Sequence, residues 1–242
     1  MIKTGIDYTK ILFFDVETVH GSEKLFKAET SLATAWGHIC ESKYKEESDD
    51  FGMLYKKYAA LYPEFGKVVC FSMGYFTNEK DFTVKAYYSD NEKALLDEFS
   101  KVITKNLTGN VKFLGGHNIK RFDIPYMMRR AIIQDVYLPT IFDTYLKKPW
   151  ELNDYVDTLE VWQCGTIGLG SSTLESIAAS FGMKSPKEEM SGDMVSTVYY
   201  MPSGPDFKRI GKYCNFDTIT SAAVYMKMSK GHYNMKVIEN IY

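Results

Sequence analysis

The chain has 242 residues, of which 45% are hydrophobic and 15% aromatic, so it can bury a large core and fits one domain better than two. Its net charge of −2 lacks the basic excess that marks many nucleic-acid-binding proteins. No apolar run approaches the roughly 20 residues of a membrane helix, and the first residues show no secretory signal. We therefore expect a cytoplasmic globular protein with no membrane partner.

The cysteines are widely spaced and include no Cys-x-x-Cys pair. This spacing indicates neither a zinc knuckle nor a dense disulfide framework. We expect reduced, buried thiols at Cys40, Cys70, Cys164 and Cys214.

The first strand signal is the apolar run over residues 11–14, which ends directly in Asp15. A continuous apolar run is typical of a central strand that is buried on both faces. We expect the carboxylates that follow to lie at the exit of this strand. Residues 19–66 resemble an insertion, in which a charged loop over 41–50 precedes apolar residues at helical spacing over 51–61.

Strands and helices alternate along the rest of the chain. Runs of strand-forming residues over 67–76 and 81–88 flank a short polar turn and predict a hairpin. A further strand is predicted over 111–116. Apolar residues at helical spacing predict helices over 91–105, 123–133, 173–181 and 205–227. This order predicts one α/β domain spanning 1–242, a three-layer sandwich in which helices flank a mixed central β-sheet.

Asp15 and Glu17 are two residues apart at the first strand, so their side chains point to the same side. Two neighbouring carboxylates repel each other, so either one takes up a proton or a cation binds between them. Oxygen ligands of this kind suit Mg²⁺ or Mn²⁺. The alternative is that both are ordinary solvated residues beyond the strand end. For this pair alone, the two interpretations are equally good.

Asp123 precedes Ile124, Pro125 and the rest of a predicted helix, which is the usual position of a helix N-cap. The same position lies near the carboxyl edge of the sheet, where open α/β sheets place their sites. Helix capping and metal binding are therefore both open for Asp123.

Tyr213 and Asp217 are four residues apart in the last predicted helix, so they share one face. A phenol and a carboxylate that face inward need partners in an apolar core, and a metal ion with its water would provide them. The alternative is a packed tyrosine beside a solvated aspartate. Two divalent ions would cancel four carboxylates and turn an acidic spot into a phosphate site, so the net charge is a poor guide here.

Three fragments together resemble the motifs of a known enzyme family. Phe-Asp-Val-Glu-Thr around Asp15, Asn-x-x-x-Phe-Asp ending at Asp123 and Tyr-x-x-x-Asp ending at Asp217 resemble the DEDD superfamily of 3′–5′ exonucleases, in its tyrosine subtype. The resemblance spans about 11–227. Segments that resemble stand-alone relatives of the proofreading exonuclease of family-B DNA polymerases lie at 64–72, 148–150, 157–159 and 185–187.

The resemblance implies a ribonuclease-H-like fold and phosphodiester hydrolysis with two divalent metal ions, Mg²⁺ or Mn²⁺. The implied metal ligands are Asp15, Glu17, Asp123 and Asp217. Tyr213 is expected to orient the attacking water by a hydrogen bond, because an unperturbed tyrosine, with a pKa of about 10, is a poor base at neutral pH. Candidate contacts to the terminal nucleotide are Thr18, Asn118 and Phe122.

The expected activity is 3′–5′ hydrolysis of single-stranded or frayed DNA ends, with release of nucleoside 5′-monophosphates. Such an enzyme would serve DNA replication, repair, recombination or scavenging, with any polymerase acting in trans. Three alternatives stay open: an RNA 3′-end trimming exonuclease, a catalytically silent nucleic-acid-binding partner of a polymerase, and a small-molecule phosphoesterase.

Overall fold

The structure is a computed structural model, and it describes residues 2, 5–148, 151–166, 172–183 and 190–240. Two residues of the segment 148–150, and all of 185–187, lie outside the described residues. Within the described ranges, no helix combines the length and the apolar character needed to cross a membrane.

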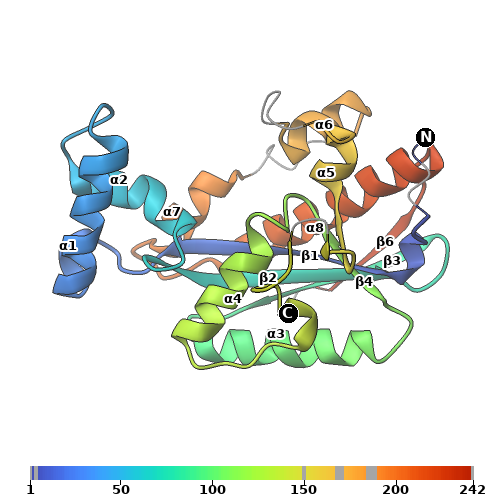
Figure 1. The fold of residues 1–242 in the computed structure, drawn as a ribbon, viewed down its shortest axis with the longest axis horizontal. Coiled ribbons are helices and arrows are strands. Elements are labelled where there is room, and N and C mark those ends of the chain that lie inside the picture. Colours follow the sequence, from blue (N-terminus) through green and yellow to red (C-terminus); the bar gives the residue numbers. More distant parts are fainter. Residues whose placement is uncertain (1, 3–4, 149–150, 167–171, 184–189, 241–242) are drawn as a thin grey trace.

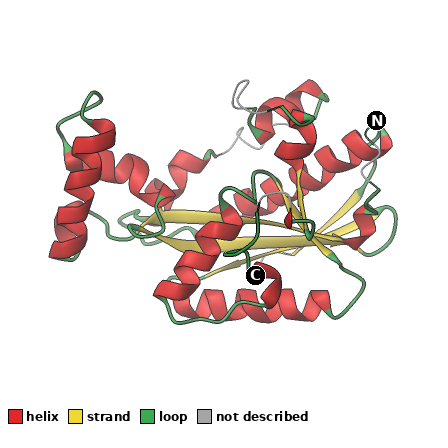
Figure 2. Cartoon of the chain, viewed as in Figure 1, coloured by secondary structure: helices red, strands yellow, loops and turns green. Residues whose placement is uncertain are grey.

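A mixed sheet forms the middle layer, between helices (Figure 2). It has six strands in the order β5-β4-β1-β2-β3-β6. Its strands are β1 (Ile11–His20), β2 (Gly66–Phe76), β3 (Asp81–Tyr88), β4 (Phe113–Gly116), β5 (Tyr155–Asp157) and β6 (Lys236–Asn240). β1 pairs antiparallel with β2 and parallel with β4. The predicted hairpin is confirmed as β2 and β3, which pair antiparallel from Cys70 opposite Tyr88 to Phe76 opposite Phe82.

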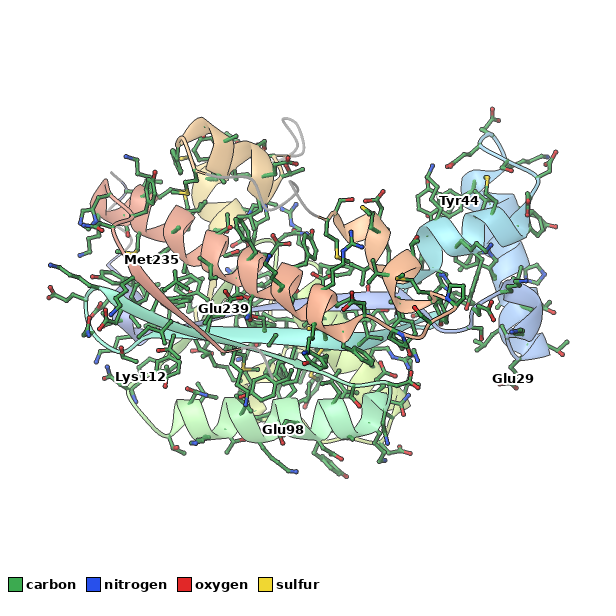
Figure 3. All side chains as sticks on the ribbon, turned by 180° about the vertical axis from the view of Figure 1, so that it is seen from behind. Glu29, Tyr44, Glu98, Lys112, Met235 and Glu239 are labelled. Carbon is green, nitrogen blue, oxygen red and sulfur yellow. The ribbon has the colours of Figure 1, made fainter. Side chains whose placement is uncertain are left out.

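Helices cover both faces of the sheet (Figure 1). The helices of the fold include α1 (Thr30–Ile39), α2 (Phe51–Tyr58), α3 (Glu92–Leu107), α4 (Asp123–Ile133), α5 (Thr158–Gln163), α6 (Leu174–Ser180), α7 (Val195–Tyr199) and α8 (Phe207–Lys230). α3 and α4 pack on one face, and α8 packs on the other. Seen from behind, α8 again lies opposite α3, which carries the labelled Glu98 (Figure 3). The predicted α/β sandwich is confirmed.

β1 is buried on both faces, which explains its continuous apolar run. Leu12 and Phe14 belong to the core beneath α3 and α4. Ile11 and Phe13 belong to the core beneath α8. All four side chains are fully buried, so alternation along the strand supplies apolar groups to two separate layers.

The prediction that the carboxylates lie at the exit of β1 is wrong. The strand continues to His20, and Asp15 and Glu17 lie within it. The reason is long-range pairing: Asp15 is opposite Ser72 and Glu17 is opposite Cys70 on β2. These pairs extend the ladder past the apolar run, until a register shift after Glu17 marks a bulge.

The segment between β1 and β2 contains two helices beside the sheet, at the left of Figure 1. The predicted amphipathic helix is confirmed as α2, whereas α1 was not predicted, because Trp36 is its only fully buried residue and gives no apolar stripe. The two helices share a small core of their own. Its buried members are Trp36, Cys40, Leu54, Tyr55, Ala59 and Phe65.

The end of this insertion is bonded to the rest of the domain at the backbone of Ala60. The Ala60 carbonyl oxygen accepts hydrogen bonds from Thr18 Oγ1 on β1, at 2.8 Å, and from the Tyr126 hydroxyl on α4, at 2.9 Å. The insertion is thereby tied to the strand and to the helix that carry predicted metal ligands.

A buried ion pair reinforces this junction. The Arg130 guanidinium on α4 donates to both oxygens of Glu92 at the start of α3, and its Nη1 donates to the Pro63 carbonyl of the insertion at 2.6 Å. Glu92 Oε1 also accepts the Val68 N–H of β2, at 2.7 Å. One carboxylate therefore joins α3, α4 and β2, and its guanidinium partner reaches the insertion.

We expect Glu92→Ala to lower the free energy of unfolding by about 3–5 kcal/mol, because it leaves the Arg130 charge buried without its carboxylate. Urea denaturation measures the change. Asp97→Ala, on the exposed side of the same helix, is the matched control and should change stability by less than about 0.5 kcal/mol. Equal effects of the two substitutions would contradict the assigned role of the buried pair.

Candidate metal centre

Two carboxylates line the side of β1 that faces α8. Ile11 and Phe13 face α8, and alternation along the strand adds Asp15 and Glu17 to the same row. From α8, the Cys214 thiol lies 3.6 Å from Asp15 Oδ2. One oxygen of each carboxylate and Cys214 Sγ all lie within 4.8 Å of one another. The prediction that Asp15 and Glu17 share a side is confirmed.

Asp123 reaches the same strand from its edge. In the described part of the chain, β4 pairs with β1 only from Ile11 to Phe13. Beyond Phe13, the first residue of α4 lies against this edge of β1. Asp123 is the first residue of α4 and is buried, and its Oδ1 accepts the Val16 N–H of β1 at 3.2 Å. The alternative role as the helix N-cap is wrong, because Phe122 takes that position. The carboxylate instead bonds to a backbone donor at the strand edge.

Tyr213 and Asp217 lie one turn apart on α8, and both are half-buried. Burial raises the pKa of the Tyr213 phenol, and the negative charges of Asp217, Glu17 and Asp15 raise it further, together with a hydrogen bond to the Asp217 carboxylate. Asp217 also acts on the carboxyls of Asp15 and Glu17. It therefore belongs to the acidic cluster and not to a solvated stripe.

The pKa values show that this cluster is under electrostatic strain. Burial raises the pKa of Asp15 well above its usual range, and the charges of Asp217 and Asp123 raise it further. For Glu17 the same shift comes from burial and then from Asp15 and Asp217. Burial also raises the pKa of Asp123 to about 7, although the Val16 N–H opposes the shift. Burial and repulsion therefore disfavour the ionised forms of all three carboxyls, and added positive charge would favour them.

The donor set fits a hard divalent cation. Carboxylate oxygens from β1, α4 and α8 converge, and oxygen ligands of this kind are those that Mg²⁺ and Mn²⁺ prefer. A bound cation would offset the repulsion that raises the pKa values of these groups. The cluster therefore has both the ligands and the electrostatic need for an ion.

Two residues beside the cluster were not assigned to it from the sequence. Cys214 contacts Asp15. Its position next to Tyr213 in the last predicted helix was the sequence feature that could have indicated this contact. Asp157, at the end of β5, accepts three backbone N–H groups near the second motif. The expectation of buried thiols is confirmed for Cys40, Cys70 and Cys214 but is wrong for Cys164, which is exposed.

The three predicted substrate contacts make other contacts in the structure. Thr18 donates its hydroxyl hydrogen bond to the Ala60 carbonyl of the insertion. Phe122 is half-buried, and its ring centroid lies 5.3 Å from that of Tyr126. Asn118 adopts a left-handed backbone conformation, with a φ of 60°, and its N–H donates to Asp157. Their contact with a nucleotide stays a prediction.

The mixed six-stranded sheet and its flanking helices form a ribonuclease-H-like α/β fold. A family described as predicted 3′–5′ exonucleases related to the exonuclease domain of PolB matches residues 60–239, which is most of the chain. The chain belongs to this family. The matched region begins after Asp15 and Glu17, so it contains the second and third motifs but not the first.

Among solved structures, the chain is similar to the family B DNA polymerase from the hyperthermophilic archaeon Pyrobaculum calidifontis. The TM-score is 0.55 and the identity is 16%, over 90% of this chain and 24% of the polymerase. At this identity the likeness shows the fold alone. The chain thus spans about a quarter of the polymerase's length. No curated protein matches it in sequence.

Without a divalent ion, we expect the Tm to fall as the pH rises from about 4 to about 7. The Asp123 pKa is about 7 in the folded chain and about 3.9 in an unfolded chain. Between these values the folded chain binds more protons, so its stability decreases with increasing pH. The raised pKa values of Asp15 and Glu17 act in the same direction.

Thermal unfolding in EDTA across this pH range measures the effect, and Mn²⁺ at a pH of about 7.5 should raise the Tm again, because it binds the folded state. Asp123→Asn is the control and should flatten the pH dependence. A wild-type Tm that rises through this pH range in EDTA would show that the cluster is not strained.

Proposed function

We propose that the protein is a metal-dependent 3′–5′ exonuclease of the tyrosine subtype, which hydrolyses the terminal phosphodiester bond of single-stranded or frayed DNA and releases nucleoside 5′-monophosphates. The observation that carries the proposal is the convergence of one tyrosine and four carboxylates from three elements of the fold. Membership of a family of predicted 3′–5′ exonucleases supports it.

In the proposed mechanism, the four carboxylates hold two divalent ions, Mg²⁺ or Mn²⁺. These ligands are Asp15, Glu17, Asp123 and Asp217. When bound, the ions would lower the pKa of water and stabilise negative charge on the reacting phosphate. β1 fixes two of the ligands relative to each other, because both belong to one buried strand.

Tyr213 acts as a hydrogen-bond donor that orients the attacking water. Its pKa is raised above the ordinary value for tyrosine by burial and by three neighbouring carboxylates, so the phenol stays protonated at neutral pH. A protonated phenol is no general base, but it can position a water molecule or the phosphate through its O–H group.

DNA is the favoured substrate because the family is related to the exonuclease domain of PolB. RNA is the alternative that matched DNA and RNA strands would distinguish. The complete set of five groups favours an active enzyme over a silent binding partner. We propose that residues 1–242 form one exonuclease domain and that it acts in the cytoplasm.

We expect Asp15→Asn to lower the rate of shortening of a 5′-labelled single-stranded oligonucleotide by about a thousandfold or more. A ligand worth several kcal/mol to the transition state corresponds to a loss of this size. The assay uses Mg²⁺ and Mn²⁺ separately, and gel analysis follows each product length. Wild-type protein that leaves the DNA strand intact with both ions would disprove the proposed activity, and equal rates for the variant would indicate a contaminant.

Tyr213→Phe should reduce kcat by about a hundredfold while the Mn²⁺ concentration for half-maximal activity stays unchanged, because the phenol positions water and does not bind the ions. Rates measured over a range of Mn²⁺ concentrations separate the two effects. Tyr225→Phe, on the same helix but with its hydroxyl bonded to Ile6, is the matched control. A shifted Mn²⁺ dependence in Tyr213→Phe would instead assign the phenol to metal binding.

A further inference from the structure

Asp157, a buried carboxylate outside the acidic cluster, binds the segment between β4 and α4, which contains the second motif. Asp157 ends β5 and is the N-cap of α5, and its side chain is buried. Its Oδ1 accepts the Asn118 N–H at 2.8 Å and the Leu159 N–H at 2.9 Å. Its Oδ2 accepts the Lys120 N–H at 3.1 Å. One carboxylate therefore both starts a helix and holds two backbone sites of another segment.

The residues after Asp157 add two more contacts to the same connection. Thr158 Oγ1 lies 2.9 Å from Nδ1 of His117, and Glu160 forms an ion pair of 2.7 Å with Lys120. These bonds join the start of α5 to residues 117–120, which lead from β4 into α4. We call this set of contacts, made by Asp157, Thr158 and Glu160, the α5 clamp.

The clamped connection needs such a restraint. Asn118 has a φ of 60°, a conformation that is uncommon for residues other than glycine and that costs free energy. The carboxylate accepts backbone N–H groups on both sides of Ile119, and charge-assisted bonds of this type are strong. Without Asp157, both half-buried N–H groups would lose their acceptor. The turn would then rely on its other bonds, such as those that the Asn118 carbonyl accepts from Arg121 and Phe122.

The clamp lies immediately before a proposed metal ligand. Lys120, whose N–H is held by Asp157, is three residues from Asp123. Asp123 in turn must reach the Val16 N–H at the edge of β1. A short connection fixed at one end and bonded to β1 at the other leaves its carboxylate little freedom. Asp157 is also close enough to Asp123 for its negative charge to act on that carboxyl.

We propose that Asp157 is a positioning residue for the metal site: it holds the β4–α4 connection so that Asp123 is presented to the cations, without binding them itself. This inference rests on the proposed function. It gives Asp157, the last residue of β5, a role that differs from that of the four proposed metal ligands.

Two substitutions separate the parts of this role. Asp157→Ser retains a good N-cap for α5, but its side chain is too short to hold Asn118 and Lys120 as well. Asp157→Asn retains one carbonyl oxygen, removes the charge and turns an N–H₂ group toward a backbone donor. Asp50→Ser is the matched control, because Asp50 caps α2 of the insertion by bonds of 2.9 Å to two backbone N–H groups.

The test measures Mn²⁺ binding to each full-length variant by calorimetry, without nucleic acid, and then the Mn²⁺ concentration for half-maximal cleavage. We expect Asp157→Ser to weaken both by about tenfold to a hundredfold, as is typical for groups that orient metal ligands. Asp157→Asn should weaken them less, and Asp50→Ser should leave both unchanged. Circular dichroism checks folding, and Asp157→Asn decides the matter if the serine variant does not fold.

Wild-type Mn²⁺ affinity in a folded Asp157 variant, with the wild type cleaving DNA normally, would overturn the positioning role and leave the proposed function intact. A wild type that neither binds Mn²⁺ nor cleaves DNA would overturn the proposed function and, with it, this inference. A loss of activity without a change in Mn²⁺ affinity would also count against Asp157, because it would indicate an effect on a step other than metal binding.

Discussion

The main physical constraint on this structure is the repulsion among the carboxylates of the acidic cluster. Burial and mutual charge raise the pKa values of Asp15, Glu17 and Asp123 together, so the site destabilises the chain that builds it. The surrounding structure tolerates this cost because β1 is packed on both faces and α8 lies directly across the carboxylates. Free energy stored in such a cluster becomes available when a cation binds.

The site is built where the partners of β1 change. On one side, β2 pairs with β1 as far as His20, whereas on the other side β4 pairs with β1 only up to Phe13. The start of α4 occupies the edge that β4 leaves, and Asp123 bonds there to the Val16 N–H. A short strand next to a long one thus creates room for a ligand from a helix. The α5 clamp binds the connection between β4 and α4.

The sequence predicted what depends on local pattern. Alternating or helical spacing located the β2–β3 hairpin and α4, and the carboxylate spacing placed Asp15 and Glu17 on one side. It failed where long-range contacts decide: β1 continues past its apolar run because β2 pairs with it. β6 was missed because its described side chains are exposed and only pairing with β3 makes it a strand. The role of Asp157 depends on β4 and β5 being neighbours.

The attachment of the insertion has a practical consequence for protein engineering. Ala60 accepts one hydrogen bond from Thr18, which follows Glu17, and another from Tyr126, which follows Asp123 by less than one helical turn. Deleting the insertion to make a minimal enzyme would remove the acceptor for both hydroxyls. A truncation of the insertion would therefore keep every carboxylate of the acidic cluster and still remove a hydrogen bond that supports β1 and one that supports α4.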